Sequence, residues 1–429
     1  MSDGRKTARQ LMEAGLPRRY SRERRFRVLG MLAVSVGLTF LVLFFASIVA
    51  SGYKAFAQSQ VALDVYLDPA LISPTGATNP EALALGDYSG LVRQSLYDLF
   101  PDVSGRSDRR ALAQLVSVGA SYQLQNLVAA DPDAIGETRR VWVPASADVD
   151  MVVKGSIDRT LPEESRPVKD RELVWIDRLT ETGRLQLKFN TALFTNGDSR
   201  EPELAGIRGA LMGSFYMLLV TVALAFPIGV AAAVYLEEFA PRNRWTDLIE
   251  VNINNLAAVP SIVFGLLGLA VFINWASLPR SSPLVGGLVL SLMTLPVIII
   301  AARASIKAVP PSIKEAALGL GASKMQMVFQ HVLPLALPGI LTGTIIGMAR
   351  ALGETAPLLM IGMVAFIVDI PQGPLDPSAA LPVQVYLWAD SPERAFVERT
   401  SAAIIVLLGF LLVMNLTAVL LRRRFERSF

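Results

Sequence analysis

Six apolar tracts dominate the sequence, and each is long enough to cross roughly 30 Å of hydrocarbon as a helix. The 429 residues are 52% hydrophobic and only 18% charged, a balance outside that of ordinary soluble domains. We therefore predict an all-α polytopic membrane protein with six transmembrane helices. The tracts are residues 28–50, 209–235, 256–275, 284–302, 336–369 and 401–421.

Positive charge lies at both ends of this set of tracts. The segment 1–27 and the tail 422–429 are basic, so the positive-inside rule predicts that both termini face the cytoplasm. The first tract, with Ala55 and Ala57 after it, also resembles a cleavable secretory signal. Its apolar run exceeds the roughly 7–15 residues of a signal peptide, so we expect an uncleaved anchor. Under both interpretations, residues 51–205 lie outside the cytoplasm.

The segment 51–205 is much more polar than the rest of the chain. Alternating runs at 61–67 and 184–189 predict strands, and 89–127 has helical spacing with few breakers. We expect a small α+β extracytoplasmic domain between the first and second transmembrane helices, followed by a transmembrane domain over 206–421. The segment contains no catalytic constellation, and a scaffold or a partner-docking module is the expected role.

Composition excludes several kinds of chemistry. The chain has no cysteine and a single histidine, His331, so disulfides, thiolate metal sites and Ser-His catalysis are not expected. A formal net charge of +3 gives no support to nucleic-acid binding. The run Gly319–Lys324 lacks the spacing of a phosphate-binding loop, so we expect no ATP site, cofactor, metal or enzymatic activity in this chain.

The loop 303–335 joins the fourth and fifth tracts and is expected to face the cytoplasm. Ser312 with Glu315 suggests a capping box, which predicts a helix over 313–320 that stops at Gly321. A second helix is expected to begin near 322–323 and to end before Pro334. Two short helices would form a rigid knob on the membrane surface, which suggests a docking element.

The fifth tract, 336–369, is too long for one straight span, since about 1.5 Å per residue would give about 50 Å. Pro357 predicts a break near 353–357, next to the charged residues Arg350 and Glu354. Gly339, Gly343 and Gly347 form a ridge that another helix can approach closely. Arg350 and Glu354 each follow one of these glycines by seven positions, so we expect both charges to face the packed interior or a pathway beside it.

Charges inside a span cost about 2.5–3.5 kcal/mol each on the insertion scale, more than an exposed ion pair returns. Two interpretations remain open: an Arg–Glu pair that fixes helix register, and a role in substrate passage or gating. Arg303 ends the fourth tract and is expected to be an anchor at the cytoplasmic edge, with an anion contact as the alternative. Glu237 and Glu238 are expected at a solvated helix end or in contact with the loop.

The loop also carries a family resemblance. Glu315-Ala316-Ala317, then Gly321, then Leu333-Pro334 resembles the cytoplasmic loop of the membrane subunits of binding-protein-dependent ABC importers. The resemblance implies that this loop docks on the ATP-hydrolysing subunit. In that role Glu315 would make a polar contact, Ala316 and Ala317 would permit close approach, and Gly321 would permit the turn.

A second resemblance concerns the stretch from Arg350 to Leu359. It resembles the fifth-helix segment of phosphate-importer permeases, in which an arginine followed by Gly-Glu-Thr-Ala-Pro recurs, and residues 205–214, 227–240 and 255–268 agree. The resemblance covers about 200–421 and implies that Arg350 and Glu354 line the phosphate route. We assign four residues to the substrate pathway: Arg350, Glu354, Thr355 and Arg303.

The resemblance implies a type I ABC importer permease core in the bacterial inner membrane. Its expected partners are a second homologous permease subunit, a dimer of ATP-binding subunits, an extracytoplasmic phosphate-binding protein and membrane lipid. A permease for another oxyanion, such as sulfate, molybdate or phosphonate, is an alternative. The charge and the planar guanidinium of an arginine do not distinguish one tetrahedral oxyanion from another. An ATP-independent transporter or channel is a further alternative, against which the docking knob argues.

Overall fold

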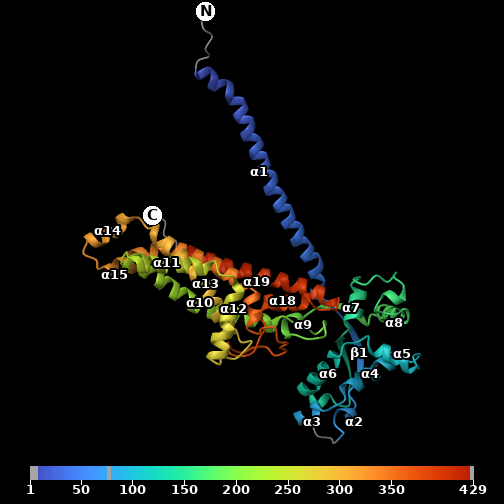
Figure 1. The fold of residues 1–429 in the computed structure, drawn as a ribbon. Helices are drawn as coiled ribbons and strands as arrows, with labels where there is room; N and C mark the ends of the chain where they lie inside the picture. The colour runs from blue at the N-terminus through green and yellow to red at the C-terminus, as the bar shows by residue number, and fades with distance from the viewer. Residues whose placement is uncertain (1–7, 75–78, 426–429) are drawn as a thin grey trace, which may run out of the picture. The chain divides into compact units, whose positions relative to one another are not determined.

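The computed structural model describes residues 8–74 and 79–425, so Arg5, Lys6 and residues 426–429, which contribute to the predicted orientation, lie outside the described residues. The chain forms two units, residues 1–51 and 52–429. The first unit is the helix α1, Ala8–Gly52, which is continuous over 45 residues and contains the predicted first span (Figure 1). Its apolar side chains beyond Val28 are mostly exposed, as expected of a helix that faces lipid.

The second unit begins with an α+β domain built on a three-stranded antiparallel sheet in the order β2-β1-β3. The central strand β1 pairs Val61 with Val143 of β2 and with Leu185 of β3. Helices pack on this sheet around a core that includes Leu63, Leu96 and Leu124. The strands and helices are β1 Ala57–Tyr66, β2 Thr138–Pro144, β3 Leu185–Phe189, α2 Pro69–Ile72, α3 Pro80–Ala84, α4 Tyr88–Leu99, α5 Arg106–Ala113, α6 Gly119–Ala130, α7 Ala147–Val153, α8 Asp170–Glu181 and α9 Ala192–Thr195, with short 3₁₀ turns η1 Tyr53–Phe56, η2 Pro132–Ala134 and η3 Glu163–Ser165.

The predicted α+β class of this domain is confirmed, as are the strands near 61–67 and 184–189 and the helices within 89–127. The strand β2 was missed. Its first residues, Thr138, Arg139 and Arg140, are exposed and charged or polar, so the segment lacks the alternation by which a strand is recognised. Arg140 is nevertheless held on the sheet by Asp64 of β1, with 2.7 Å between its Nε and the carboxylate.

The helical bundle follows: α10 packs on α13, α13 on α16, and α16 on α19, and Figure 1 shows α14 and α15 at one end of it. Helix α13 is the central element, since it packs on α10, α11, α12 and α16. The elements are α10 Arg208–Val234, the π-helical segment η4 Tyr235–Phe239, α11 Arg244–Ala257, α12 Ser261–Gly268, the π-helical segment η5 Leu269–Trp275, α13 Pro283–Lys307, α14 Pro311–Gly319, α15 Lys324–Gln326, the π-helical segment η6 Met327–Val332, α16 Leu333–Gly353, α17 Ala356–Met360, α18 Leu381–Ala389 and α19 Ala395–Phe425.

In the described part of the chain, five helices are long and apolar enough to cross a membrane, or six if one bent pair is a single span. The bent pair is Arg244–Ala257 with Ser261–Trp275, which meet at 99°. The tract 256–275 was predicted to form one helix. The structure interrupts it near its start, where α11 ends at Ala257 and α12 begins at Ser261. Pro260 lies between the two helices, and it lacks the N–H that a continuous helix needs.

Polar contacts fix the α+β domain to the last two helices. Glu398 in the first turn of α19 accepts hydrogen bonds from Ser156 at 2.6 Å and Lys154 at 3.4 Å. On α18, the indole N–H of Trp388 donates to Asp198 at 3.0 Å. Lys154 is only 5% exposed and also pairs with Asp150 at 2.6 Å. The domain is thus attached rigidly to the bundle through side chains as well as through the chain.

Candidate functional site

The break in the fifth tract lies where the sequence predicts it. Helix α16 ends at Gly353, Glu354 has an extended backbone with φ −78° and ψ 123°, and α17 begins at Ala356. Pro357 lies in the first turn of α17, where a missing N–H costs nothing, and it is buried against Gly265 of α12. Irregular backbone at membrane depth needs protein or water around it, so this break belongs to the inside of the assembly.

The glycine ridge of α16 packs on α13. A methyl group added at Gly339 would lie 2.3 Å from Oγ of Ser305, and one added at Gly343 would lie 2.1 Å from the Cβ of Ala301. Neither contact is possible for a larger residue, so these glycines set the distance between the two helices. At Gly347 the nearest atom, on Thr294, would be 3.4 Å away, an ordinary contact. The two helices therefore approach most closely at Gly339 and Gly343 and remain in contact at Gly347.

The charged pair follows the glycine ridge at the C-terminal end of α16. Nε of Arg350 is 3.4 Å from Oε1 of Glu354, and the two side chains are 50% and 19% exposed. Of the two expected surroundings, the packed interior or a pathway beside it, the first does not apply to Arg350, because half of its side chain is exposed. Arg350 lies on an open side of the helix beside the break. Thr355 is partly buried, and its side chain does not cap α17.

The loop between α13 and α16 forms a knob, which consists of residues 311–326. Gly321 has φ +88°, a conformation that favours glycine, and it ends α14 as predicted. Ser323 and Gln326 form a capping box that starts α15 where a second helix is expected. The predicted capping box at Ser312 is wrong, because α14 already begins at Pro311 and Pro310 takes the N-cap position.

The second helix was expected to end before Pro334, and this expectation is wrong. It continues through η6 into α16. The π-helical segment departs from the i→i−4 hydrogen-bond ladder directly before Pro334, so the proline removes no regular helical bond there. As a result the knob is the rigid extension of a transmembrane helix, and a force on it acts directly on α16.

The outer surface of the knob is apolar. Leu318 is 47% exposed, Leu320 90% and Met325 57%. Glu315 and Ala316 are exposed on the same helix, whereas Ala317 is buried against the bundle. His331 is exposed. An exposed cluster of large apolar side chains on a rigid support is typical of a protein-binding surface.

A buried network of ion pairs connects the knob to the bundle. Glu238, at the π-helical end of α10, lies 2.5 Å from Nζ of Lys314 on α14. Its neighbour Glu237 lies 2.5 Å from Nε of Arg303 at the end of α13, and Arg303 also pairs with Glu250 of α11. The side chains of Glu237, Glu238 and Arg303 are only 8–10% exposed. Of the two alternatives for Glu238, contact with the loop is therefore correct.

This network changes the assignment of Arg303. Two carboxylates occupy its guanidinium, so it is held in ion pairs and is not available as an anion contact. The roles of Glu250, as a partner of Arg303, and of Lys314, as a partner of Glu238, were not predicted from the sequence. These residues lie 53 positions before and 11 positions after Arg303. No local spacing connects them to Arg303, although an acidic pair directly after an apolar tract is a signal that such residues need partners.

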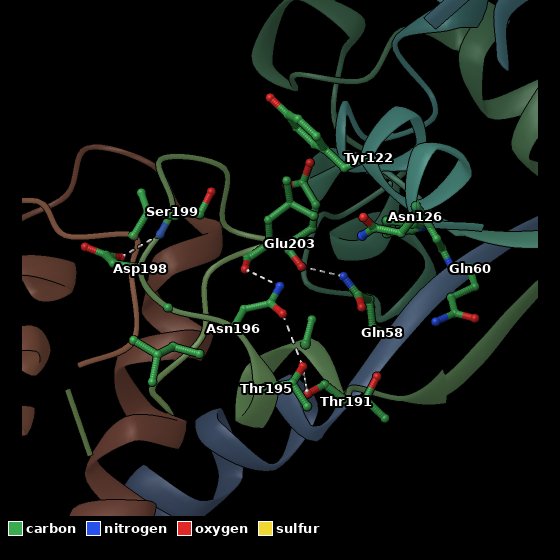
Figure 2. Close-up of a pocket in the computed structure, with 18 residues that line it drawn as sticks. Gln58, Gln60, Tyr122, Asn126, Thr191, Thr195, Asn196, Asp198, Ser199 and Glu203 are labelled. Carbon is green, nitrogen blue, oxygen red and sulfur yellow. Dashed lines mark hydrogen bonds between the residues drawn. The ribbon is translucent and has the colours of Figure 1, made fainter. Parts of the chain in front are cut away.

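A separate cavity of about 730 Å³ lies on the side of the α+β domain, against the loop that leads to α18. Figure 2 shows amide and hydroxyl side chains around it, among them Gln58, Asn126 and Thr195. Glu203 and Asp198 also line it, and burial raises the pKa of both carboxyls. None of its lining residues is cationic. An oxyanion is therefore a poor ligand for this cavity.

Comparison with known proteins places these features in a family. The model of the binding-protein-dependent transport system inner membrane component matches residues 225–428, and a domain of unknown function, DUF3333, matches residues 13–163. The phosphate transport system permease protein PstA 1 of Mycobacterium tuberculosis (strain CDC 1551 / Oshkosh) is 33% identical over 219 residues, which cover 51% of this chain and 70% of that protein.

Two further proteins are similar. The probable ABC transporter permease protein YqgI of Bacillus subtilis (strain 168) is 40% identical over 155 residues, which cover 36% of this chain and about half (52%) of YqgI. A solved structure of the MetNI methionine ABC transporter in an inward-facing conformation aligns with 52% of this chain and 96% of its own, at 18% identity and a TM-score of 0.43.

Proposed function

This chain belongs to the family of phosphate transport system permease proteins, PstA, and we propose that it performs the membrane-spanning step of ATP-driven phosphate import. It is a multi-pass inner membrane protein of the ABC permease type, with an additional α+β domain. Both termini face the cytoplasm in the proposed orientation, which follows from the basic charge at each end. In that orientation the knob is cytoplasmic and the α+β domain is extracytoplasmic.

The observation that carries this proposal is the connection of the exposed knob to the helices of the bundle. A dimer of ATP-binding subunits docks on the apolar surface of Leu318, Leu320 and Met325, next to Glu315 and Ala316. Closure of that dimer on ATP displaces the knob. Because α15, η6 and α16 are continuous, and Lys314 is paired with Glu238, the displacement reaches α16 and α10 together.

Phosphate passes beside the break between α16 and α17. The half-exposed Arg350 offers a planar fork of donors that matches a phosphate oxyanion, and Glu354 competes for the same guanidinium at 3.4 Å. A permanent free arginine would hold the anion tightly, whereas conduction needs weak binding. Exchange of Arg350 between Glu354 and phosphate gives a transient site. Thr355 lies next to this pair and is positioned to contact the same ligand.

The working importer needs partners that supply the remaining steps. A second, homologous permease subunit completes the pathway that Arg350 borders. An extracytoplasmic phosphate-binding protein delivers the anion, and ATP is bound and hydrolysed by the docked subunits. This chain itself carries out no hydrolysis.

Uptake of labelled phosphate in cells that lack this gene tests the proposal. Restoring the gene should restore ATP-dependent uptake, and excess sulfate should not compete. Competition by sulfate or molybdate would assign the permease to another oxyanion. Uptake that persists without the ATP-binding subunit would favour a channel or a secondary transporter.

A further inference from the structure

A second cavity of the α+β domain has the opposite electrostatic character to the one in Figure 2. It measures about 480 Å³ and is lined by Arg93 and Tyr97 of α4 and by Arg106, Arg109 and Arg110 of α5. None of its lining residues is acidic. We call it the arginine cavity. It is open to solvent, and its four arginines are exposed.

The helices explain why these side chains converge. Arg106, Arg109 and Arg110 are spaced i, i+3 and i+4, so they share one face of α5, and Arg93 and Tyr97 are likewise four residues apart on α4. The two helices pack against each other. The guanidinium of Arg109 lies 5.0 Å from the centre of the Tyr97 ring, which fixes it at the wall of the cavity.

Two of the acidic residues near the cavity, Asp102 and Asp108, are paired with arginines that do not line it. Asp108 of α5 lies 2.5 Å from Arg171 of α8, and Asp102 lies 3.1 Å from Arg178. Asp87 reaches Arg93 at 3.6 Å, with both side chains at least half exposed. Within residues 8–74 and 79–425, no carboxylate lies within ion-pair distance of Arg106, Arg109 or Arg110. The cavity therefore retains a positive charge.

Local stability does not explain this arrangement. Like charges at i, i+4, such as Arg106 and Arg110, destabilise a helix by a few tenths of a kcal/mol. Guanidinium groups that surround a hollow, with no carboxylate between them, are suited to an oxyanion that can accept several pairs of hydrogen bonds. The shape is concave, so a compact ligand fits it better than the flat acidic surface of another protein.

We propose that the arginine cavity is a binding site for an anion with two or more phosphate groups. The ligand is a soluble polyphosphate or a phosphate ester presented by a larger molecule, since both offer the same groups. This site goes beyond the transport role, because it lies in the α+β domain and uses none of the residues of the proposed pathway. Bound there, such an anion would be held at the outer domain of a phosphate importer.

The test uses the purified full-length chain in lipid nanodiscs and calorimetric titration with tripolyphosphate, glycerol phosphate, orthophosphate and citrate. We expect tripolyphosphate to bind most tightly and binding to weaken as salt rises. The double substitution Arg109→Gln with Arg110→Gln should weaken it at least about tenfold. The exposed Arg159→Gln is the matched control, because Arg159 pairs with Asp177 at the surface of the same domain. It should leave affinity unchanged.

Three results would overturn the site: no binding of tripolyphosphate to the unchanged protein, equal binding by citrate, or full affinity in the double variant. The thermal unfolding midpoint of the double variant shows whether it remains folded, and the single variant Arg110→Gln gives a second measurement with less perturbation. Preference for glycerol phosphate, which carries a single phosphate group, over tripolyphosphate would also contradict the proposal. An Arg350→Ala variant should keep tripolyphosphate affinity while it loses phosphate uptake, so failure of this site and failure of the transport role are distinguishable.

Discussion

The ammonium group of Lys314, on the exposed knob, lies 2.5 Å from the carboxylate of Glu238, which lies in η4 at the end of α10. Glu238 is 8% exposed and Lys314 24%, so the pair is largely shielded from water. It joins the surface proposed to receive the ATP-binding subunits to the helix that starts next to the α+β domain. Charge pairs in this position transmit displacement well, because breaking one leaves a buried charge unpaired.

Glu238→Gln should lower the phosphate transported per ATP hydrolysed by several-fold. Removing one partner of a fully buried pair costs about 3–5 kcal/mol, and the cost here is smaller because Lys314 is partly exposed. The reciprocal exchange Glu238→Lys with Lys314→Glu should restore much of the coupling. Lys307→Met is the control, since Lys307 is 62% exposed and its pair with Glu237 should contribute about 0–1 kcal/mol. Phosphate uptake and ATP hydrolysis measured together in proteoliposomes give this ratio. If the charge-exchanged double variant transports no more phosphate per ATP than Glu238→Gln, the pairing role is contradicted.

Arg350→Ala should reduce phosphate uptake at least about tenfold at normal protein levels, because a charge-assisted contact of a guanidinium to an oxyanion contributes about 1.4 kcal/mol or more. Arg350→Lys should retain part of the activity, since it keeps the charge but loses the fork. Glu354→Gln separates the two interpretations of the pair. If Glu354 releases the anion, the variant should bind phosphate more tightly and turn over more slowly. If the pair only fixes helix register, phosphate affinity and turnover per folded molecule should stay unchanged, and uptake should fall only in proportion to the loss of folded protein.

Gly343→Ala should destabilise the bundle, because the new methyl group would lie 2.1 Å from the Cβ of Ala301. Overpacking of this kind costs about 1–3 kcal/mol. Gly347→Ala is the matched control on the same helix, where the nearest atom would be 3.4 Å away. Thermal unfolding in detergent should show a lower midpoint for Gly343→Ala only. Adding Ala301→Gly, which removes the opposing methyl group, should recover the loss, and an unrecovered midpoint would contradict the contact.

Asp64 gives the α+β domain a defined pH dependence. Hydrogen bonds from Arg140 and Arg184 lower the pKa of its carboxyl from 3.8 to about 2. A carboxyl whose pKa is lowered in the folded state contributes stability above its unfolded pKa and loses it as pH falls through the folded pKa, here between about pH 4 and pH 2. Because Asp64 is about a third exposed, the contribution is on the order of 1 kcal/mol. The difference in unfolding midpoint between the natural protein and Asp64→Asn should shrink across that window. A constant difference would show that the ion pair does not control it.

The tracts and the break at Pro357 could be predicted from the sequence because both depend on local rules, namely hydrocarbon thickness and the missing N–H of proline. The same holds for Gly321, whose positive φ belongs to a helix end. Partners distant in the chain could not be predicted. In the sequence, Arg303 is an arginine at the end of an apolar tract. Only the fold places it within ion-pair distance of Glu237 and Glu250.

The exposure of Arg350 could not be decided from the sequence for a related reason. Helical spacing gives the direction of a side chain relative to the glycine ridge, but it does not tell whether the neighbouring helix continues alongside. Helix α13 approaches α16 closely at Gly343 and lies at ordinary distance by Gly347. Beyond that point Ala351 is still fully buried, whereas half of the neighbouring Arg350 side chain is exposed.

The most direct test of the central claim is phosphate uptake into proteoliposomes that contain this chain, its permease partner, the ATP-binding subunits and the phosphate-binding protein. The account predicts uptake of labelled phosphate that requires ATP, resists excess sulfate, and falls at least about tenfold with Arg350→Ala while the assembled complex stays intact. Undiminished uptake with Arg350→Ala in an intact complex would contradict it.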